Sequence, residues 1–146
     1  EFLADSSIET IQLTLSSDLK EVDKIVKLLE NIGDKYQIDS DMLGSIVIAT
    51  TEAVTNAIRH GNNEDKTKIV NVHFDIYSTK VKVLIKDQGN GFIPEELPDP
   101  LAEENLHRNS GRGVYLIRMY MDNVSISADS TGTTIVMEKQ VEIHLK

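Results

Sequence analysis

Hydrophobic and polar residues alternate in five stretches of the chain, and this alternation is typical of β-strands buried on one face. The stretches are residues 8–15, 68–77, 80–87, 123–129 and 132–139. Only Ser78 and Thr79 separate the second stretch from the third, which predicts a tight hairpin. Gly132 lies in the turn region between the last two stretches, which predicts a second hairpin at the end of the chain.

Three other stretches have the apolar spacing of amphipathic helices. They are residues 18–36, residues 40–60 and residues 111–121. Ser17 or Asp18 can cap the first helix, Asp39 or Ser40 can cap the second, and Gly61 is suited to end it. Residues 93–110 show no clean period and hold all three prolines, and a loop this long inside a compact domain is usually functional or mobile.

The composition is that of a soluble globular protein. The 146 residues are 40% hydrophobic and 27% charged, and no cysteine is present for a disulfide or a thiolate metal site. No apolar stretch approaches the roughly 20 residues that span a bilayer, and no segment has the layout of a signal peptide. We therefore expect one domain over residues 1–146, with its core at about residues 8–140, located in the cytoplasm and not at a membrane.

The charge is strongly acidic. Fifteen Lys+Arg residues stand against 24 Asp+Glu residues, which gives a net charge of −9. This balance argues against non-specific binding of nucleic acid and allows a partner with a basic patch.

In the second predicted helix, Glu52 and Asn56 lie four residues apart and therefore share a face. The apolar stripe on the other side consists of Leu43, Ile46, Val47, Thr50, Val54, Ala57 and Ile58. Besides Glu52, Asn56 and His60, the first face holds the small residues Ser45 and Ala49, unlike a solvated face rich in lysine and glutamate. Its composition favours the wall of a cavity, and a solvated helix face is the alternative.

Asp87 continues the buried side of the strand that precedes it, so a carboxylate emerges where that strand ends. A buried carboxylate needs hydrogen-bond donors from the protein or from a ligand. Gly89 and Gly91 follow and allow close approach of a ligand to the backbone. The alternative is a turn in which Asp87 caps its own backbone.

Gly111 and Gly113 directly precede or open the third helix, whose first amides and dipole favour an anion. Arg112 adds a cation between them. The alternative is that Ser110 is simply the N-cap of the helix. The chain contains no G-x-x-x-x-G-K-[ST] pattern, so this is not a P-loop.

The order of these segments resembles the ATP-binding domain shared by histidine kinases, heat-shock-90 chaperones, type II topoisomerases and MutL mismatch-repair proteins. The matching stretches are EAVTNAIRHGN, DQGNGF, GRGVYLI and the late GTT, and together they cover about residues 8–140. Within this superfamily, EAVTNAIRHG, the compact size and YMDNVSI resemble the anti-sigma-factor serine-protein kinases of the SpoIIAB and RsbW kind.

The resemblance implies a Bergerat-type ATP-binding fold. This is a two-layer α/β (α+β) sandwich, with a mixed, mostly antiparallel sheet that helices cover on one face. It also implies that ATP binds between the helices and a lid at about residues 93–110, together with Mg²⁺.

The resemblance also assigns roles to single residues. Asn56 would bind Mg²⁺, because a carboxamide oxygen suits a hard cation, and Glu52 would be the general base toward the attacking hydroxyl. Asp87 would accept a hydrogen bond from the adenine amino group, and Thr133 would support adenine.

The remaining roles concern the backbone and the phosphates. Gly89 and Gly91 would let the backbone lie close to the nucleotide, and Gly111 and Gly113 would offer amides to the phosphates. Either Arg108 or Arg112 would contact the terminal phosphate.

By the same resemblance, we expect a serine/threonine protein kinase that phosphorylates a STAS-type anti-anti-sigma protein, binds a sigma factor and forms a homodimer. Two alternatives stay open. One is an ATP-binding interaction module without phosphotransfer, and the other is an ATP-binding domain excised from a larger sensor kinase.

Overall fold

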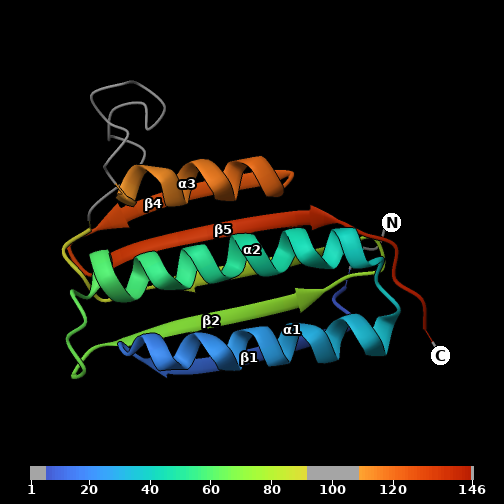
Figure 1. The fold of residues 1–146 in the computed structure, drawn as a ribbon, viewed down its shortest axis with the longest axis horizontal. Helices are drawn as coiled ribbons and strands as arrows, with labels where there is room; N and C mark the ends of the chain where they lie inside the picture. Colours follow the sequence, from blue (N-terminus) through green and yellow to red (C-terminus); the bar gives the residue numbers. More distant parts are fainter. Residues whose placement is uncertain (1–5, 92–108, 146) are drawn as a thin grey trace.

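The computed structural model describes residues 6–91 and 109–145. Within these ranges, five strands form one sheet in the order β1-β2-β3-β5-β4, and helices lie on one of its faces (Figure 1). The strands are β1 (Glu9–Ser16), β2 (Ile69–Ile76), β3 (Lys80–Lys86), β4 (Asn123–Asp129) and β5 (Gly132–Gln140). The α-helices are α1 (Val22–Tyr36), α2 (Ser40–Asn56) and α3 (Asn109–Tyr120).

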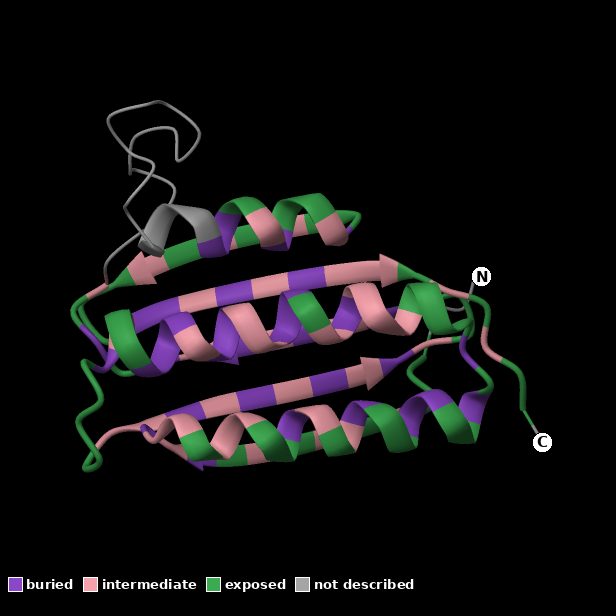
Figure 2. Cartoon of the chain, in the orientation of Figure 1, coloured by how far each residue is buried: buried purple, intermediate pink, exposed green. Residues whose placement is uncertain are grey.

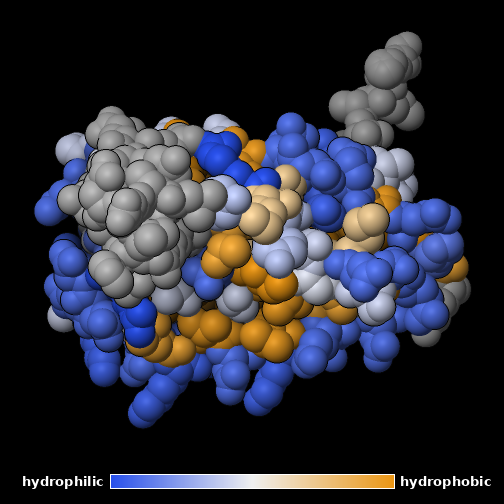
Figure 3. Space-filling view, turned by 45° about the horizontal axis from the view of Figure 1, so that its top comes forward, coloured by the Kyte–Doolittle hydropathy of each residue, from blue (hydrophilic) through white to orange (hydrophobic). Residues whose placement is uncertain are grey.

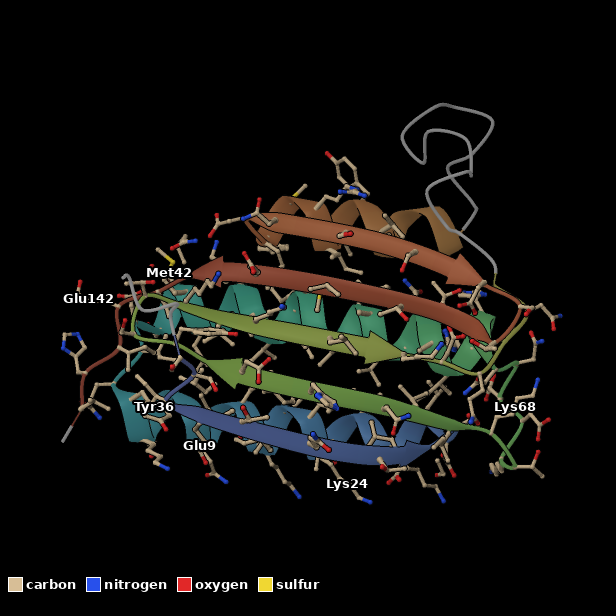
Figure 4. All side chains as sticks on the ribbon, turned by 180° about the vertical axis from the view of Figure 1, so that it is seen from behind. Glu9, Lys24, Tyr36, Met42, Lys68 and Glu142 are labelled. Carbon is tan, nitrogen blue, oxygen red and sulfur yellow. The ribbon has the colours of Figure 1, made fainter. Side chains whose placement is uncertain are left out.

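The two-layer α/β sandwich expected from the resemblance is confirmed. All strand pairs of the described sheet are antiparallel, where a mixed sheet is expected, and hairpins form two of these pairs, β2–β3 and β4–β5. Viewed from behind, the opposite face of the sheet carries no helix of the described residues (Figure 4). This leaves the helix face of the sheet as the side on which a site between layers can form.

The core lies between the sheet and the helices. Along β2 and β3, buried and half-buried residues alternate, as the hydrophobic pattern predicts (Figure 2). The buried side of β2 consists of Val70, Val72, Phe74 and Ile76. Asp87 directly follows β3 on the buried side and is 5% exposed, so the core layer ends in a carboxylate at that edge.

Capping residues set the starts of the first two helical segments as the sequence predicts. Asp39 accepts hydrogen bonds from the amides of Asp41 and Met42 at the start of α2, and Asp18 accepts one from the amide of Lys20. A short 3₁₀ turn, η1 (Leu19–Glu21), precedes α1. Gln37 ends α1 in the left-handed conformation with φ 54°, and the buried Gly33 lies inside this helix, near its end.

The second helix differs from its prediction at its end. The α-helix stops at Asn56, and one turn of π-helix, η2 (Ala57–Gly61), continues it. The Asn62 amide donates to the Ala57 carbonyl at 2.8 Å, five residues back. Single π turns are frequent at functional sites, and this one directly follows Asn56.

The outer side of the helix layer is partly apolar. Figure 3 shows a band of hydrophobic residues along this layer. The exposed large hydrophobic residues of α2 and α3 are Met42, Ile48, Tyr115 and Met119. Within residues 6–91 and 109–145, no helix has the length and apolar character needed to cross a membrane.

Candidate functional site

The carboxylate of Asp87 is held by two backbone amides. Its Oδ1 accepts from the Gly89 amide at 2.9 Å and from the Thr133 amide at 3.0 Å. The Asp87 amide in turn donates to the Thr133 carbonyl at 3.0 Å. The first of these bonds is the Asp turn that was one of the two alternatives, and the second ties the turn to β5. Asp87 therefore caps its own loop with Oδ1, and Oδ2 takes no part in this cap.

The second oxygen of Asp87 faces the end of η2. A Cβ atom added to Gly61 would lie 2.1 Å from Oδ2 of Asp87, so only glycine leaves room for the carboxylate there. Gly132, with φ 142°, would likewise place a Cβ 2.1 Å from the Asp87 carbonyl oxygen. Two glycines therefore enclose Asp87, and the sequence analysis assigns one to a helix end and the other to a turn. Their shared partner in space is not visible from either local pattern.

Gly89 and Gly91 do allow close approach, but in this structure the neighbour is the protein backbone. A Cβ on Gly89 would lie 2.0 Å from the Gly61 carbonyl oxygen, and a Cβ on Gly91 would lie 2.1 Å from that of Asp129. Gly91 also has a φ of 83°, which favours glycine. The loop after β3 therefore rests on η2 at one point and on the β4–β5 turn at another.

The β4–β5 turn is itself braced by a carboxylate. Asp129 accepts hydrogen bonds from the hydroxyl and, at 2.8 Å, the amide of Thr131. The hydroxyl bond is the main cause that lowers the pKa of Asp129, so this residue is ionised and its turn is fixed at neutral pH. This turn supports the position of Gly91.

Asn56 is brought against the third helix. It is 8% exposed, and a Cβ on Gly113 would lie 2.5 Å from its Nδ2 and 2.9 Å from its Oδ1. Within the described part of the chain, Nδ2 is buried and has no hydrogen-bond partner. A buried carboxamide without a partner is uncommon in a folded protein, and it marks a place where a ligand can complete the hydrogen bonding.

Glu52 lies one turn before Asn56 on α2 and is half-buried. Among the residues that the structure describes, its carboxylate has no hydrogen bond or ion pair. Its neighbours Ala49 and Ala53 are fully buried, because α2 packs against α3 on this side. The expected cavity wall is thus partly a helix–helix contact, made close by small residues, and the polar pair lies toward its end.

The third helix begins two residues earlier than predicted, at Asn109. Gly111 is then its third residue and Gly113 its fifth. An amide at the fifth position pairs with the carbonyl four residues back, whereas the amides of the first turn have no partner within the helix. Of the two glycines, Gly111 is the one whose amide is available to an anion, and Gly113 allows contact with Asn56.

Several expected site features lie outside the described residues. Arg108 and most of the expected lid at residues 93–110 fall there. Arg112 belongs to α3, but its side chain is not among those described. Thr133 is 5% exposed and is joined to Asp87 through both of its backbone groups.

Asn62 is a residue that the sequence analysis misses. It is fully buried, and it bonds to Ser17 Oγ, to the Ile69 carbonyl and to the Gln88 amide. The only local signal is an asparagine after the helix-ending Gly61, which reads as a turn residue. Its role depends on partners from three other parts of the chain.

Together these residues form a polar edge of the helix–sheet interface. Asp87 can accept a hydrogen bond through Oδ2, Asn56 can coordinate a hard cation or donate to an anion, and Glu52 can accept a proton. No cluster of three or more His, Asp or Glu side chains suited to a metal occurs among the described residues. A cation here would take few protein ligands and complete its shell with ligand oxygens and water, as Mg²⁺ commonly does.

Comparisons with known proteins agree on one family. Residues 15–139 match the family model described as histidine kinase-like ATPase domain. The chain is 30% identical over 144 residues to serine-protein kinase RsbW of Staphylococcus aureus strain JH9, and the alignment covers 94% of this chain and 90% of that protein. The same figures hold for RsbW of strain Newman.

Solved structures show the same fold. The RsbU and RsbW domains of Rv1364c from Mycobacterium tuberculosis match with a TM-score of 0.69 and 17% identity, over 91% of this chain and 32% of that one. The blue-light activated histidine kinase EL346 of Erythrobacter litoralis matches with a TM-score of 0.53 and 21% identity, over 70% of this chain and 31% of that one.

Proposed function

We propose a function from one premise, which is that this chain belongs to the histidine kinase-like ATPase family and, within it, to the RsbW-type serine-protein kinases. The protein binds Mg-ATP and transfers the γ-phosphoryl group to a serine or threonine of a STAS-type anti-anti-sigma protein. A sigma factor is its second partner, so that the kinase switches between the two.

The observation that carries this proposal is that Asp87 and Asn56 both lie at one end of the helix layer, beside Gly61 and Gly113 respectively. Asp87 has one oxygen fixed by two amides and the other beside Gly61, which suits a single directed hydrogen bond to the amino group of adenine. Asn56 has a buried carboxamide without a complete set of partners in the described residues. Adenine and phosphates are the ligand parts that match these two ends.

Each residue has a defined task in the proposed reaction. Asp87 and Thr133 orient adenine, and Asn56 would hold Mg²⁺ through its carboxamide oxygen. Mg²⁺ supplies positive charge that offsets the charge of the phosphate oxygens. Glu52 takes the proton of the serine hydroxyl, and the serine oxygen forms a bond to the γ-phosphorus. The bond from that phosphorus to the β–γ bridging oxygen breaks, and ADP leaves with the bonding electrons.

The remaining roles are also part of the proposal. Gly111 contributes an amide to the phosphates at the start of α3. Either Arg108 or Arg112 contacts the terminal phosphate, as the resemblance implies. Gly89 and Gly91 keep the loop after β3 close to η2 and to the β4–β5 turn, which holds Asp87 in place.

A pair of substitutions on one helix tests the proposal. Glu52→Gln keeps the shape of the side chain and removes the proton acceptor, so nucleotide affinity is retained and phosphotransfer falls by about 10²–10⁴-fold. Asn56→Ala removes an oxygen ligand and weakens Mg-ATP binding itself. Calorimetry with Mg-ATP and intact-mass measurement of a STAS-type substrate read out the two effects.

The outcomes separate a kinase from a binding module. Equal phosphotransfer by the wild type and the Glu52→Gln variant removes Glu52 from the mechanism. Tight ATP binding with no phosphate gained by any STAS-type substrate identifies the protein as an ATP-binding module. No nucleotide binding at millimolar ATP contradicts the proposal altogether.

A further inference from the structure

The hydrogen-bonded ladder between β2 and β3 ends at Lys86, just before the turn from Asp87 to Gly89. Asn71 pairs with Lys86 in the last row of this ladder, and in the same register Ile69 would face Gln88 two rows farther on, past Val70 and Asp87. In a hydrogen-bonded antiparallel pair, each of these residues would donate its amide to the carbonyl of the other. The structure shows a different arrangement at this place.

The side chain of Asn62 is inserted between the two strands. The Gln88 amide donates to Asn62 Oδ1 at 2.7 Å, and Asn62 Nδ2 donates to the Ile69 carbonyl at 3.0 Å. The Ile69 amide donates to the Gln88 side-chain oxygen Oε1 at 2.7 Å, which closes a ring of three bonds. The carboxamide of Asn62 therefore acts as a peptide group added to the ladder.

Burial makes this inserted group a strong constraint. Asn62 is fully buried, and its Nδ2 also donates to Ser17 Oγ at 2.9 Å, which donates in turn to the Lys68 carbonyl at 2.7 Å. Leaving any of these groups unpaired in the interior costs about 1–3 kcal/mol. The Asn62 backbone is fixed as well, because its amide bonds to the carbonyl of Ala57 in η2.

The insertion directs the loop after β3 toward the helices. A direct Ile69–Gln88 pair would draw Gln88 toward β2, whereas the Asn62 bridge holds it one side chain farther away. The next residue, Gly89, then rests on the carbonyl of Gly61, and its amide fixes Oδ1 of Asp87. The position of Asp87 relative to Asn56 thus depends on a bridge that begins at the end of the same helical segment.

We propose that Asn62 is a positioning residue that sets the place of the Asp87 loop relative to the Asn56 helix and thereby the selectivity for adenine nucleotides. This inference rests on the proposed function, because it assigns Asp87 to adenine. Asn62 touches neither the reacting atoms nor the phosphates in this assignment. Its effect is therefore on nucleotide affinity and base selectivity, and the rate of phosphotransfer at saturating ATP is preserved.

The test compares Asn62→Ala with Ser17→Ala. Both variants remove buried hydrogen bonds, but only Asn62→Ala removes the bridge to Gln88, and it leaves Ile69 and Gln88 free to pair directly. We expect the Kd for ADP and the KM for ATP to rise by about 5–100-fold in Asn62→Ala, with kcat unchanged and the preference for ADP over GDP reduced. Ser17→Ala should lose stability and keep the affinity, the KM and the base preference of the wild type.

A second measurement needs no nucleotide. Protons of Gly61 and Gly89 should show a nuclear Overhauser contact in the wild type and in Ser17→Ala, and this contact should disappear in Asn62→Ala. Hydrogen exchange of the Gln88 amide, on an exposed residue, should be slow in the wild type because Asn62 holds it. This exchange measurement covers the case in which Asn62→Ala does not fold.

The results decide the two proposals separately. Any one of three results overturns the role of Asn62. They are a Gly61–Gly89 contact that is retained in Asn62→Ala, equal ADP affinity in the wild type and Asn62→Ala, and fast exchange of the Gln88 amide in the wild type. Absence of ADP binding by the wild type overturns the proposed function, and the Gly61–Gly89 contact still decides whether Asn62 positions the loop.

Discussion

Single residues at this site have two different jobs, and the division is clearest within the carboxylate of Asp87. Oδ1 belongs to the fold, since it accepts the amides of Gly89 and Thr133. Oδ2 lies beside Gly61 and is the oxygen that the proposed function assigns to adenine. A carboxylate is needed for both jobs at once, because all of its lone pairs accept hydrogen bonds.

Replacing Asp87 by Asn should weaken nucleotide binding and largely keep the fold. The carboxamide can use its oxygen for the two amides, but it then presents an NH₂ group where adenine also presents a donor. The loss of a buried hydrogen bond corresponds to about 1–3 kcal/mol, which is about 5–150-fold in the Kd for ADP measured by calorimetry. Asp75→Asn, on the uncovered face of the sheet, is the matched control. An unchanged Kd in the Asp87 variant would be evidence that this carboxylate does not contact the base.

A second residue pair, at the other end of the sheet, should make stability depend on pH. Tyr36 is 3% exposed and donates a hydrogen bond to Glu9, and the two lie together at the end of the sheet away from Lys68 (Figure 4). This bond is the main cause that lowers the pKa of Glu9 below its usual 4.5, with Lys35 second. Burial, followed by the bond to Glu9, raises the pKa of Tyr36.

The sign of the effect follows from these directions. A carboxyl with a lowered pKa in the folded state adds stability above its unfolded-state pKa, and this contribution is lost as the pH falls through the folded-state value. Tyr36→Phe should therefore lower the free energy of unfolding by about 1 kcal/mol at pH 7, and the difference from the wild type should shrink below about pH 4.5. Urea unfolding across this range measures it, with Tyr77→Phe as the control. A difference that is constant from pH 7 to pH 3 would exclude the bond to ionised Glu9 as its cause.

The sequence predicts some of these residues well and others not at all, and the reason is the range of the interactions. The burial of Asp87 follows from strand parity, because each residue of a strand faces the side opposite to its neighbour. The task of Asn62 cannot be predicted in this way, because its partners Ser17, Ile69 and Gln88 come from segments that only the folded sheet brings together. Strand and helix positions depend on local periodicity, whereas a bridging residue depends on topology.

At the scale of elements, the same distinction applies to the helices. Capping residues predict the start of α2, but the change from α-helix to π-helix after Asn56 has no sequence signal of its own, since Ala57 and Ile58 continue the apolar stripe. The start of α3 two residues before Gly111 is also missed, because glycine is a weak helix former and is taken to precede the helix. Tertiary packing explains why a glycine lies inside this helix at position 113, since Gly113 lets α3 approach Asn56.

The contact between α2 and α3 can be tested with two glycines. Gly113→Ala would place a methyl group 2.5 Å from Asn56 Nδ2, so the buried carboxamide must move. We expect Mg-ATP binding to weaken by about tenfold, as alanine displaces the side chain proposed to hold the ion. The fold should be retained, because alanine favours a helix by up to about 1 kcal/mol over glycine.

Gly44 provides the control on α2. A Cβ at Gly44 meets no atom of the described residues within 4 Å, so Gly44→Ala should raise the free energy of unfolding by up to about 1 kcal/mol and leave nucleotide affinity unchanged. Calorimetry and thermal unfolding of both variants give the comparison. If Gly113→Ala binds Mg-ATP as tightly as the wild type does, the position of the Asn56 carboxamide against α3 has no part in binding.

At the scale of the whole molecule, the strands β1 and β4 form the two edges of the sheet within the described part of the chain. The sequence analysis expects a homodimer, which stays a prediction, and the edge strand β1 is a candidate surface for it. The unpaired side of an edge strand presents backbone donors and acceptors that a second copy can use. A two-fold axis near the middle of β1 would pair the strand with its own copy in antiparallel fashion.

The register across the sheet supplies a matched pair of variants for this prediction. Gln12 in β1 pairs with His73, and the same row continues through Leu84 and Val136 to Ser125 in β4. Gln12 and Ser125 are both exposed and occupy equivalent places on opposite edges. Gln12→Lys would place two like charges next to each other at a β1–β1 interface, which is destabilising, whereas Ser125→Lys adds the same charge far from it.

We expect light scattering at high protein concentration to give the mass of a dimer for the wild type and for Ser125→Lys, and a mass shifted toward the monomer for Gln12→Lys. Thermal unfolding should be similar for the two lysine variants if each monomer is folded, so that a change in mass reports the interface alone. Dissociation of Ser125→Lys with an intact Gln12→Lys dimer would assign the interface to β4. A monomeric mass for the wild type, with and without ADP, would show that neither edge pairs under these conditions and would contradict the dimer.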